Sequence, residues 1–198
     1  MIRNNFEQIK SIVSFDPDYA FAVDIIQRRK DIPNLDVTSR LVTSFLVTSE
    51  EGYERRRRDI IPICDALGAR AMINLNRVNL KKVALECNYK VGQLLKHGSY
   101  KAVKTAYKRS LGVSGVHDKG HRYWMIDWDG EEVEECKLSD VRAFLGENLI
   151  EEIKSNSGRS LIIKPHDTRA LQLKFNSLVL YKNSPVNLYI PTFSSRTK

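Results

Sequence analysis

The sequence predicts an α+β protein built on a split βαβ sheet of the ferredoxin or RNA-recognition (RRM-like) type, antiparallel or mixed, with helices packed on it. Apolar runs rich in β-branched residues alternate with amphipathic segments in the order strand-helix-strand, helices, strand-helix-strand, then short strands. A doubly wound sheet, the alternative, would require a more regular alternation. The chain has 198 residues, 42% of them hydrophobic, which fits one sizeable domain or one domain with a helical attachment.

Residues 1–35 are predicted to form a helical N-terminal segment that precedes an α+β domain at 36–198. Apolar residues between Phe6 and Val13 recur at a spacing of three to four, as on one side of a helix. Asp16 and Pro17 then resemble a helix cap and a first helical turn, so we expect a second helix at 17–26.

A strand, a helix and a second strand are predicted next. The run 41–48 is rich in β-branched and aromatic residues, which are typical of strands. Ser49 is a favourable N-cap for a helix that extends to Leu67, and Gly68 is suited to end it. The apolar run 69–75 is the second strand.

A basic helical insertion is expected at 79–111. Asn79 is a favourable N-cap for a long amphipathic helix at 80–96. A shorter basic helix is expected at 100–111, and glycines at both ends of 112–120 indicate a loop.

The C-terminal half returns to short strands. Between two of these strands a short helix is expected, because Ser139 and Gly146 are residue types that begin and end helices. The other expected elements are a strand at 122–129, strands at 149–154 and 160–164 joined by a turn at 156–158, a helical turn after Pro165, and strands at 178–181 and 188–190.

Charge is divided unevenly along the chain, whose formal net charge is +8. Between Arg77 and Arg109 nine lysines and arginines face one acid, whereas between Asp129 and Glu152 nine acids face two basic residues. A basic surface favours an anionic partner, with nucleic acid or a nucleoside triphosphate first. A charge division of this kind is also compatible with a protein-docking surface.

Three cysteines without a CxxC pair predict neither a zinc knuckle nor a disulfide framework. The first residues lack the apolar core of a signal peptide, and no apolar run approaches membrane-spanning length. We therefore expect a cytoplasmic protein without a membrane partner.

Asp127 and Asp129 end the apolar strand 122–129. Alternate side chains of a strand point to the same face, so the two carboxylates are expected to project together. Carboxylate oxygens suit Mg²⁺ or Mn²⁺, the ions that hold nucleotide phosphates. The alternative is a solvated strand end before the turn at Gly130.

Basic residues and tyrosines are interleaved in the helical insertion, a mixture that phosphate contacts and base stacking would use. The candidate nucleic-acid-binding residues are Arg77, Lys81, Lys82, Lys101, Lys104, Lys108 and Arg109. His117 and His121 lie in the following loop, where a polar loop, a phosphate contact and a loop metal site are all open interpretations.

The run Met125-Ile-Asp-Trp-Asp129, followed by the run Asn156-Ser-Gly-Arg-Ser-Leu-Ile-Ile-Lys164, resembles two motifs of the catalytic core of archaeo-eukaryotic primases and primase-polymerases. The resemblance implies a metal at Asp127 and Asp129, which would be catalytic in an active enzyme. It also implies nucleotide contacts at Arg159, Ser160, Lys164 and His166.

Two departures from the primase pattern bear on activity. Arg159 or Ser160 stands where the family has a histidine, and no acid follows Asp167 to supply a third carboxylate. We interpret the chain as a reduced member, of phage or mobile-element type, that binds nucleic acid or nucleotide. An active metal-dependent nucleotidyltransferase and a viral or mobile-element protein-interaction factor are the alternatives.

Overall fold

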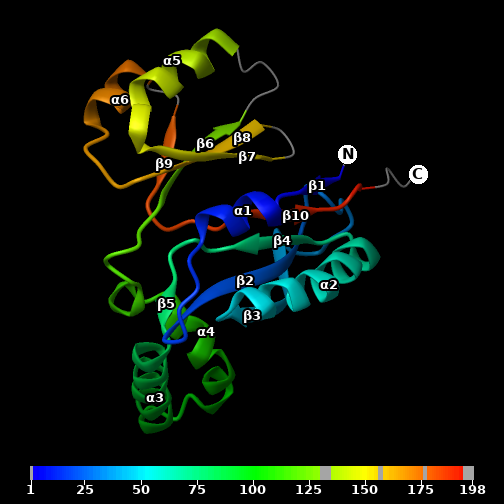
Figure 1. Cartoon of the computed structure of the whole chain (residues 1–198). Coiled ribbons are helices and arrows are strands. Elements are labelled where there is room, and N and C mark those ends of the chain that lie inside the picture. The colour runs from blue at the N-terminus through cyan, green and yellow to red at the C-terminus, as the bar shows by residue number, and fades with distance from the viewer. Residues whose placement is uncertain (1, 130–134, 156–157, 176–177, 194–198) are drawn as a thin grey trace.

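The computed structural model describes residues 2–129, 135–155, 158–175 and 178–193, and it contains two antiparallel sheets (Figure 1). The first sheet has the strand order β1 (Arg3–Asn4), β10 (Val186–Ile190), β4 (Arg70–Ile73), β2 (Tyr19–Arg28) and β3 (Ser39–Val47), with β5 (Val78–Asn79) also paired to β2. The second has the order β7 (Leu149–Lys154), β8 (Gly158–Ile163), β6 (Trp124–Asp129) and β9 (Val179–Tyr181).

Helix α2 (Glu50–Leu67) connects β3 to β4, and these two strands lie on either side of β2, each antiparallel to it. The helix forms where the sequence predicts it. The Ser49 hydroxyl accepts a hydrogen bond from the Gly52 N–H at 3.0 Å, and Gly68 ends the helix with a φ of 59°, a conformation that favours glycine.

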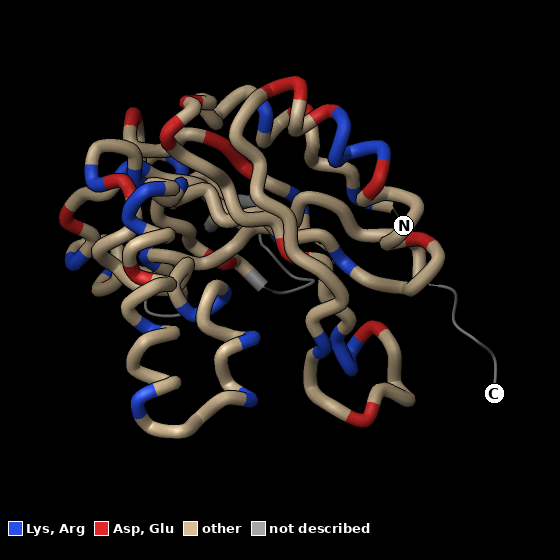
Figure 2. Tube along the Cα trace, turned by 90° about the horizontal axis from the view of Figure 1, so that it is seen from below, with Lys and Arg blue, Asp and Glu red and all other residues tan. Residues whose placement is uncertain are grey.

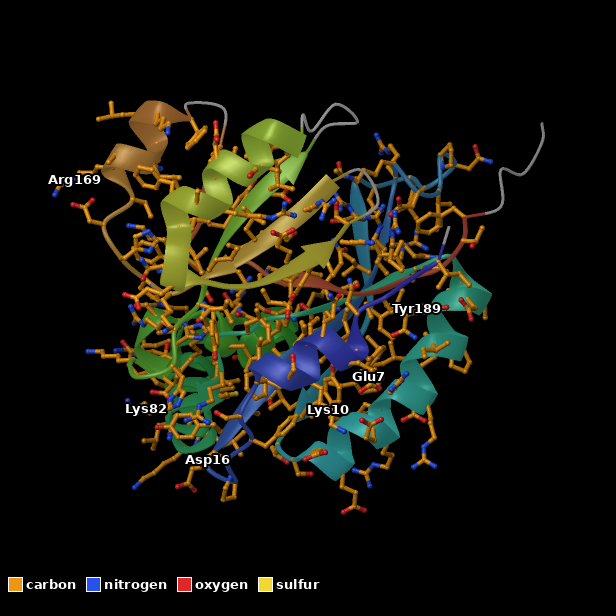
Figure 3. The ribbon with its side chains drawn as sticks, turned by 45° about the horizontal axis from the view of Figure 1, so that its top comes forward. Glu7, Lys10, Asp16, Lys82, Arg169 and Tyr189 are labelled. Carbon is orange, nitrogen blue, oxygen red and sulfur yellow. The ribbon has the colours of Figure 1, made fainter. Side chains whose placement is uncertain are left out.

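Helix α1 (Phe6–Ile12) packs beside α2 and contacts β10 and β7, one strand from each sheet. Lys10 lies 2.9 Å from a carboxylate oxygen of both Glu50 and Glu54 on α2, and Arg57 pairs with Glu7. Figure 3 shows Glu7 and Lys10 on the side of α1 that faces α2. The N-terminal segment is therefore integrated with the first sheet.

The predicted second helix at 17–26 is wrong, because this stretch is β2, the central strand of the first sheet. Val23 and Ile25 are buried on the face toward α2, while Asp24 between them points to the other face. Alternation with period two and β-branched side chains fit a strand better than a helix. The N-terminal helical segment is thus limited to α1.

Both faces of the second sheet contribute side chains to an apolar cluster. Helices α5 (Glu135–Leu145) and α6 (Arg169–Lys174) cover its outer face, where Ile126 and Leu161 belong to a separate apolar cluster. A short 3-10 turn, η3 (Gly146–Asn148), connects α5 to β7. On the inner face, Met125 and Ile162 join the core of the first sheet, so the two sheets share packing.

The helical insertion forms an arm that lies at the far end of the molecule from α5 and α6 (Figure 1). It consists of α3 (Leu80–Lys96), η1 (Tyr100–Thr105) and α4 (Ala106–Leu111), and η2 (Ser114–Val116) follows it. The Asn79 side chain caps α3 by accepting from the Lys82 N–H at 3.0 Å, as predicted. Val83 is the one buried residue of α3, which therefore exposes most of its surface.

The predicted α+β class is confirmed, and every strand pairing of the described residues is antiparallel. A single ferredoxin- or RRM-like sheet is not confirmed, because the strands divide between two sheets. Among the described helices, none combines the length and apolar character that crossing a membrane requires.

Candidate functional site

Asp127 lies on the inner face of the second sheet, beside Ser160. The two residues are paired in register on β6 and β8, and the Ser160 hydroxyl lies 3.5 Å from the Asp127 carboxylate. On the other side of Asp127, β9 contributes Val179, which is 50% exposed. The half-buried carboxylate therefore lies next to a part of the sheet that solvent reaches.

The side chain of Asp129, the second predicted metal ligand, lies outside the described part of the structure. Its backbone ends β6 in register with Gly158. Among the described side chains no group of three or more metal-ligating residues comes together. The structure thus brings the Asp127 carboxylate and the Ser160 hydroxyl together as oxygen donors.

Arg159 lies on the opposite face of the sheet from Asp127, although it directly precedes Ser160, the residue paired with Asp127. Its backbone pairs with Trp128, and its guanidinium lies 3.2 Å from Glu152, which also binds Arg142 of α5. Hydrogen bonds from Arg142 lower the pKa of Glu152, burial opposes them, and Arg159 adds to the lowering. The predicted nucleotide contact at Arg159 is therefore not on the Asp127 face.

Lys164 and His166 are also separated from Asp127. They follow the end of β8, which pairs there with Trp124, whereas Ser160 lies four residues earlier and about 13 Å along the strand. His166 Nδ1 lies 2.8 Å from the carbonyl oxygen of Lys164. Of the four predicted nucleotide contacts, the structure brings only Ser160 beside Asp127.

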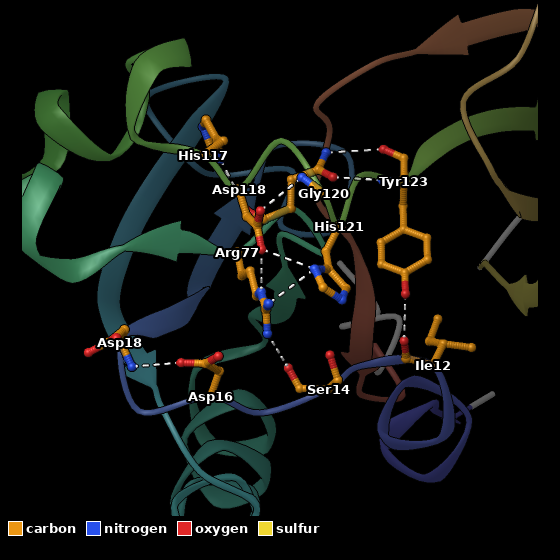
Figure 4. A network of polar contacts seen from close by, with 11 residues as sticks. Ile12, Ser14, Asp16, Asp18, Arg77, His117, Asp118, Gly120, His121 and Tyr123 are labelled. Atoms are coloured by element: carbon orange, nitrogen blue, oxygen red, sulfur yellow. Dashed lines mark hydrogen bonds and ion pairs between the residues drawn. The ribbon is translucent and has the colours of Figure 1, made fainter.

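Arg77 was predicted to bind nucleic acid, but it is 6% exposed and belongs to an internal polar network (Figure 4). Its Nε donates to Asp118 at 2.9 Å, its NH1 donates to the Ser14 carbonyl at 3.0 Å, and its guanidinium lies over the Tyr19 ring. Burying an arginine requires such partners, and they leave no surface for a phosphate. We therefore leave Arg77 out of the candidate nucleic-acid surface.

Asp118 also contacts His121: the Asp118 carboxylate lies 3.1 Å from His121 Nδ1. Burial acts to raise the pKa of Asp118, but the Gly120 N–H, Arg77 and His121 together hold it below its ordinary value. The buried His117 contacts the Asn76 carbonyl and the Asn183 amide instead. The two loop histidines therefore do not converge on one metal, and they connect the 117–123 segment to the first sheet and to the β9–β10 turn.

Lys108 is occupied as well. Its ammonium contacts Asp24 on β2 and lies 3.3 Å from the Ser44 hydroxyl on β3. These contacts connect α4 to the face of the first sheet that is opposite α2. Lys90, similarly, lies 3.0 Å from Glu86 one helical turn away. These lysines are poor candidates for a phosphate contact.

Six other basic residues of the arm are exposed, and none forms an ion pair within the described residues. Figure 2 views the molecule from below, where Lys and Arg positions mark both helices of the arm. The six are Lys81, Lys82, Lys96, Lys101, Lys104 and Arg109. Lys96 was absent from the predicted set, and its place in the last turn of α3, two residues before Gly98, was the signal for it.

Exposed aromatic side chains accompany these cations. Tyr100 is 69% exposed, Tyr89 64% and Tyr107 46%, and they are the three most exposed aromatic residues of the described chain. Leu85, one turn before Tyr89 on α3, is 60% exposed. The arm therefore presents a surface that is both basic and aromatic.

Comparisons with protein-family models, with curated proteins and with solved structures gave no match.

Proposed function

We propose that this protein binds nucleic acid on the arm formed by residues 80–111. The observation that carries the proposal is the set of six exposed cations without ion-pair partners among the described residues. Eight lysines and arginines face one acid in this stretch, and that acid, Glu86, pairs with Lys90. A projecting surface of this charge attracts the phosphate backbone, which supplies most of the affinity in sequence-independent binding.

Removing two of these cations should weaken binding in a salt-dependent way. We expect Lys101→Gln/Lys104→Gln to reduce affinity for a labelled 20-nucleotide strand, DNA or RNA, about tenfold at 0.1 M salt. The slope of log K against log salt should fall by about 1.4, because each phosphate contact to a single strand contributes about 0.7. Fluorescence anisotropy titrations at several salt concentrations measure both quantities.

The matched control is Arg55→Gln/Arg58→Gln, which removes two exposed charges from α2 instead. This variant should keep the wild-type affinity and slope if the arm is the binding surface. An equal loss in both variants would point to general charge attraction. No binding of either nucleic acid by the wild type, together with a salt-insensitive protein complex, would favour the protein-interaction alternative.

We propose metal-dependent nucleotidyl transfer as a second candidate, within the primase-like interpretation of the fold. The juxtaposition of Asp127 and Ser160 at a solvent-accessible part of the inner face supports it. Asp127 and Asp129 would hold Mg²⁺ or Mn²⁺, which would neutralise nucleotide phosphates there. The donor set suits one ion, completed by water, better than a pair of ions.

Calorimetric titration with Mn²⁺ and a nucleoside triphosphate tests this second candidate without relying on catalysis. We expect metal-dependent triphosphate binding by the wild type and its loss in Asp127→Asn. Asp140→Asn, which neutralises an exposed carboxylate on α5, is the matched control and should bind as the wild type does. Absence of binding in the wild type would refute the candidate.

A further inference from the structure

We propose that the arm is a single-strand site, in which Tyr89 and Tyr100 stack on unpaired bases while neighbouring lysines hold the phosphates. The inference rests on the proposed nucleic-acid binding and adds the class of ligand. It places this contact on α3 and η1, which lie at the opposite end of the molecule from α5 and α6 (Figure 1).

The surroundings of Tyr89 supply the first argument. Lys82 and Lys96 lie seven residues before and after it on α3, which is close to two helical turns, so all three project from one side. All three are exposed, and Figure 3 shows Lys82 on this helix. The Tyr89 ring therefore has a lysine about 10 Å away on either side. This arrangement suits a nucleic-acid single strand in which one base stacks on the ring while the neighbouring phosphates pair with the two lysines.

Tyr100 repeats the arrangement on the adjoining segment. It begins η1 and is the most exposed aromatic side chain of the described chain. Lys101 follows it directly, and Lys104 lies one turn later, both exposed. By contrast, burial raises the pKa of Tyr107, and Cys87 adds to the effect, so this third ring packs partly against α3.

Exposure of these rings discriminates between ligand classes. Phosphates alone require cations only, and a duplex conceals the base faces on which an aromatic ring could stack. The centres of protein-binding surfaces are depleted in lysine, whereas lysines surround both tyrosines here. Unpaired bases use the rings and the lysines together, and therefore account for the whole surface.

Binding of a labelled mixed-sequence 20-nucleotide strand and of its 20-base-pair duplex at the same salt concentration tests the inference. We expect the wild type to prefer the single strand. Tyr89→Leu/Tyr100→Leu should lose about 25-fold or more for the single strand, since each stacked base contributes at least about fivefold, with little loss for the duplex. The salt slope should stay unchanged because no cation is removed.

Two control variants separate stacking from folding. Tyr89→Phe/Tyr100→Phe keeps the rings and should retain most of the affinity. Phe144→Leu removes an exposed ring from α5 and should have no effect. If the leucine variant binds the single strand as the wild type does while the Lys101/Lys104 variant is impaired, the stacking inference is wrong and nucleic-acid binding stands. If the wild type binds neither strand nor duplex, the proposed function fails as well.

Discussion

Asp31→Asn is expected to lower the free energy of unfolding by about 3–5 kcal/mol. Asp31 and Arg70 form an ion pair in which the two side chains are only 4% and 3% exposed. Arg70 Nε donates to Asp31 at 2.6 Å, and the guanidinium lies 5.5 Å from the centre of the Phe193 ring. Asparagine keeps the shape but leaves a buried positive charge on β4 without its counter-charge. Urea unfolding at pH 7 measures the loss.

Asp36→Asn, a few residues further along the same loop, provides the control. Asp36 pairs with Arg40 at 2.7 Å, but these side chains are 72% and 53% exposed. Water screens such a pair, so the change should cost about 1 kcal/mol or less. Equal losses in the two variants would mean that burial does not distinguish the pairs and would contradict the prediction.

The elements that were predicted correctly carry their signals within a few residues. Ser49 and Gly68 delimit α2, and Asn79 caps α3, through hydrogen bonds and backbone conformations that depend only on near neighbours. These signals act regardless of tertiary context. The sequence could therefore predict the bounds of both helices closely.

The division into two sheets had no comparable local signal. Leu161, Ile162 and Ile163 of β8 are all buried, because α5 and α6 cover one face of the second sheet while the first core covers the other. Such a strand lacks the alternation that would identify a solvent-facing side. Strand pairing was then inferred from the order of elements alone, and that order is compatible with one sheet or two.

Sequence reasoning recognised the basic arm but could not tell which of its cations were available. Arg77 and Lys108 are neutralised by Asp118 and Asp24, which are 41 and 84 residues away in the chain. Pairings at that distance are set by the fold. The exposure of Leu85 and Tyr89 did have a local signal, because both lie off the apolar stripe of α3.

Asn76→Asp is expected to destabilise the protein by about 3–5 kcal/mol at pH 7, because it replaces a buried donor between the two sheets by a charged acceptor. The Asn76 amide is 6% exposed and donates to the carbonyls of Tyr123 and Lys182 at 3.1 and 3.3 Å. Its oxygen accepts the Tyr123 N–H at 2.8 Å. The residue thus connects the loop after β4 to the start of β6 and to the β9–β10 turn.

The pH dependence of this variant identifies the cause. Burial among carbonyl oxygens should raise the pKa of the new carboxyl group above its unfolded value, so protonation favours the folded state and restores one O–H donor. The loss relative to wild type should therefore shrink as pH falls from 7 towards the unfolded pKa of about 4. Asn88→Asp, at an exposed position of α3, should cost less than about 0.5 kcal/mol at either pH. A pH-independent loss at position 76 would contradict the donor-to-acceptor explanation and would leave altered packing as the cause.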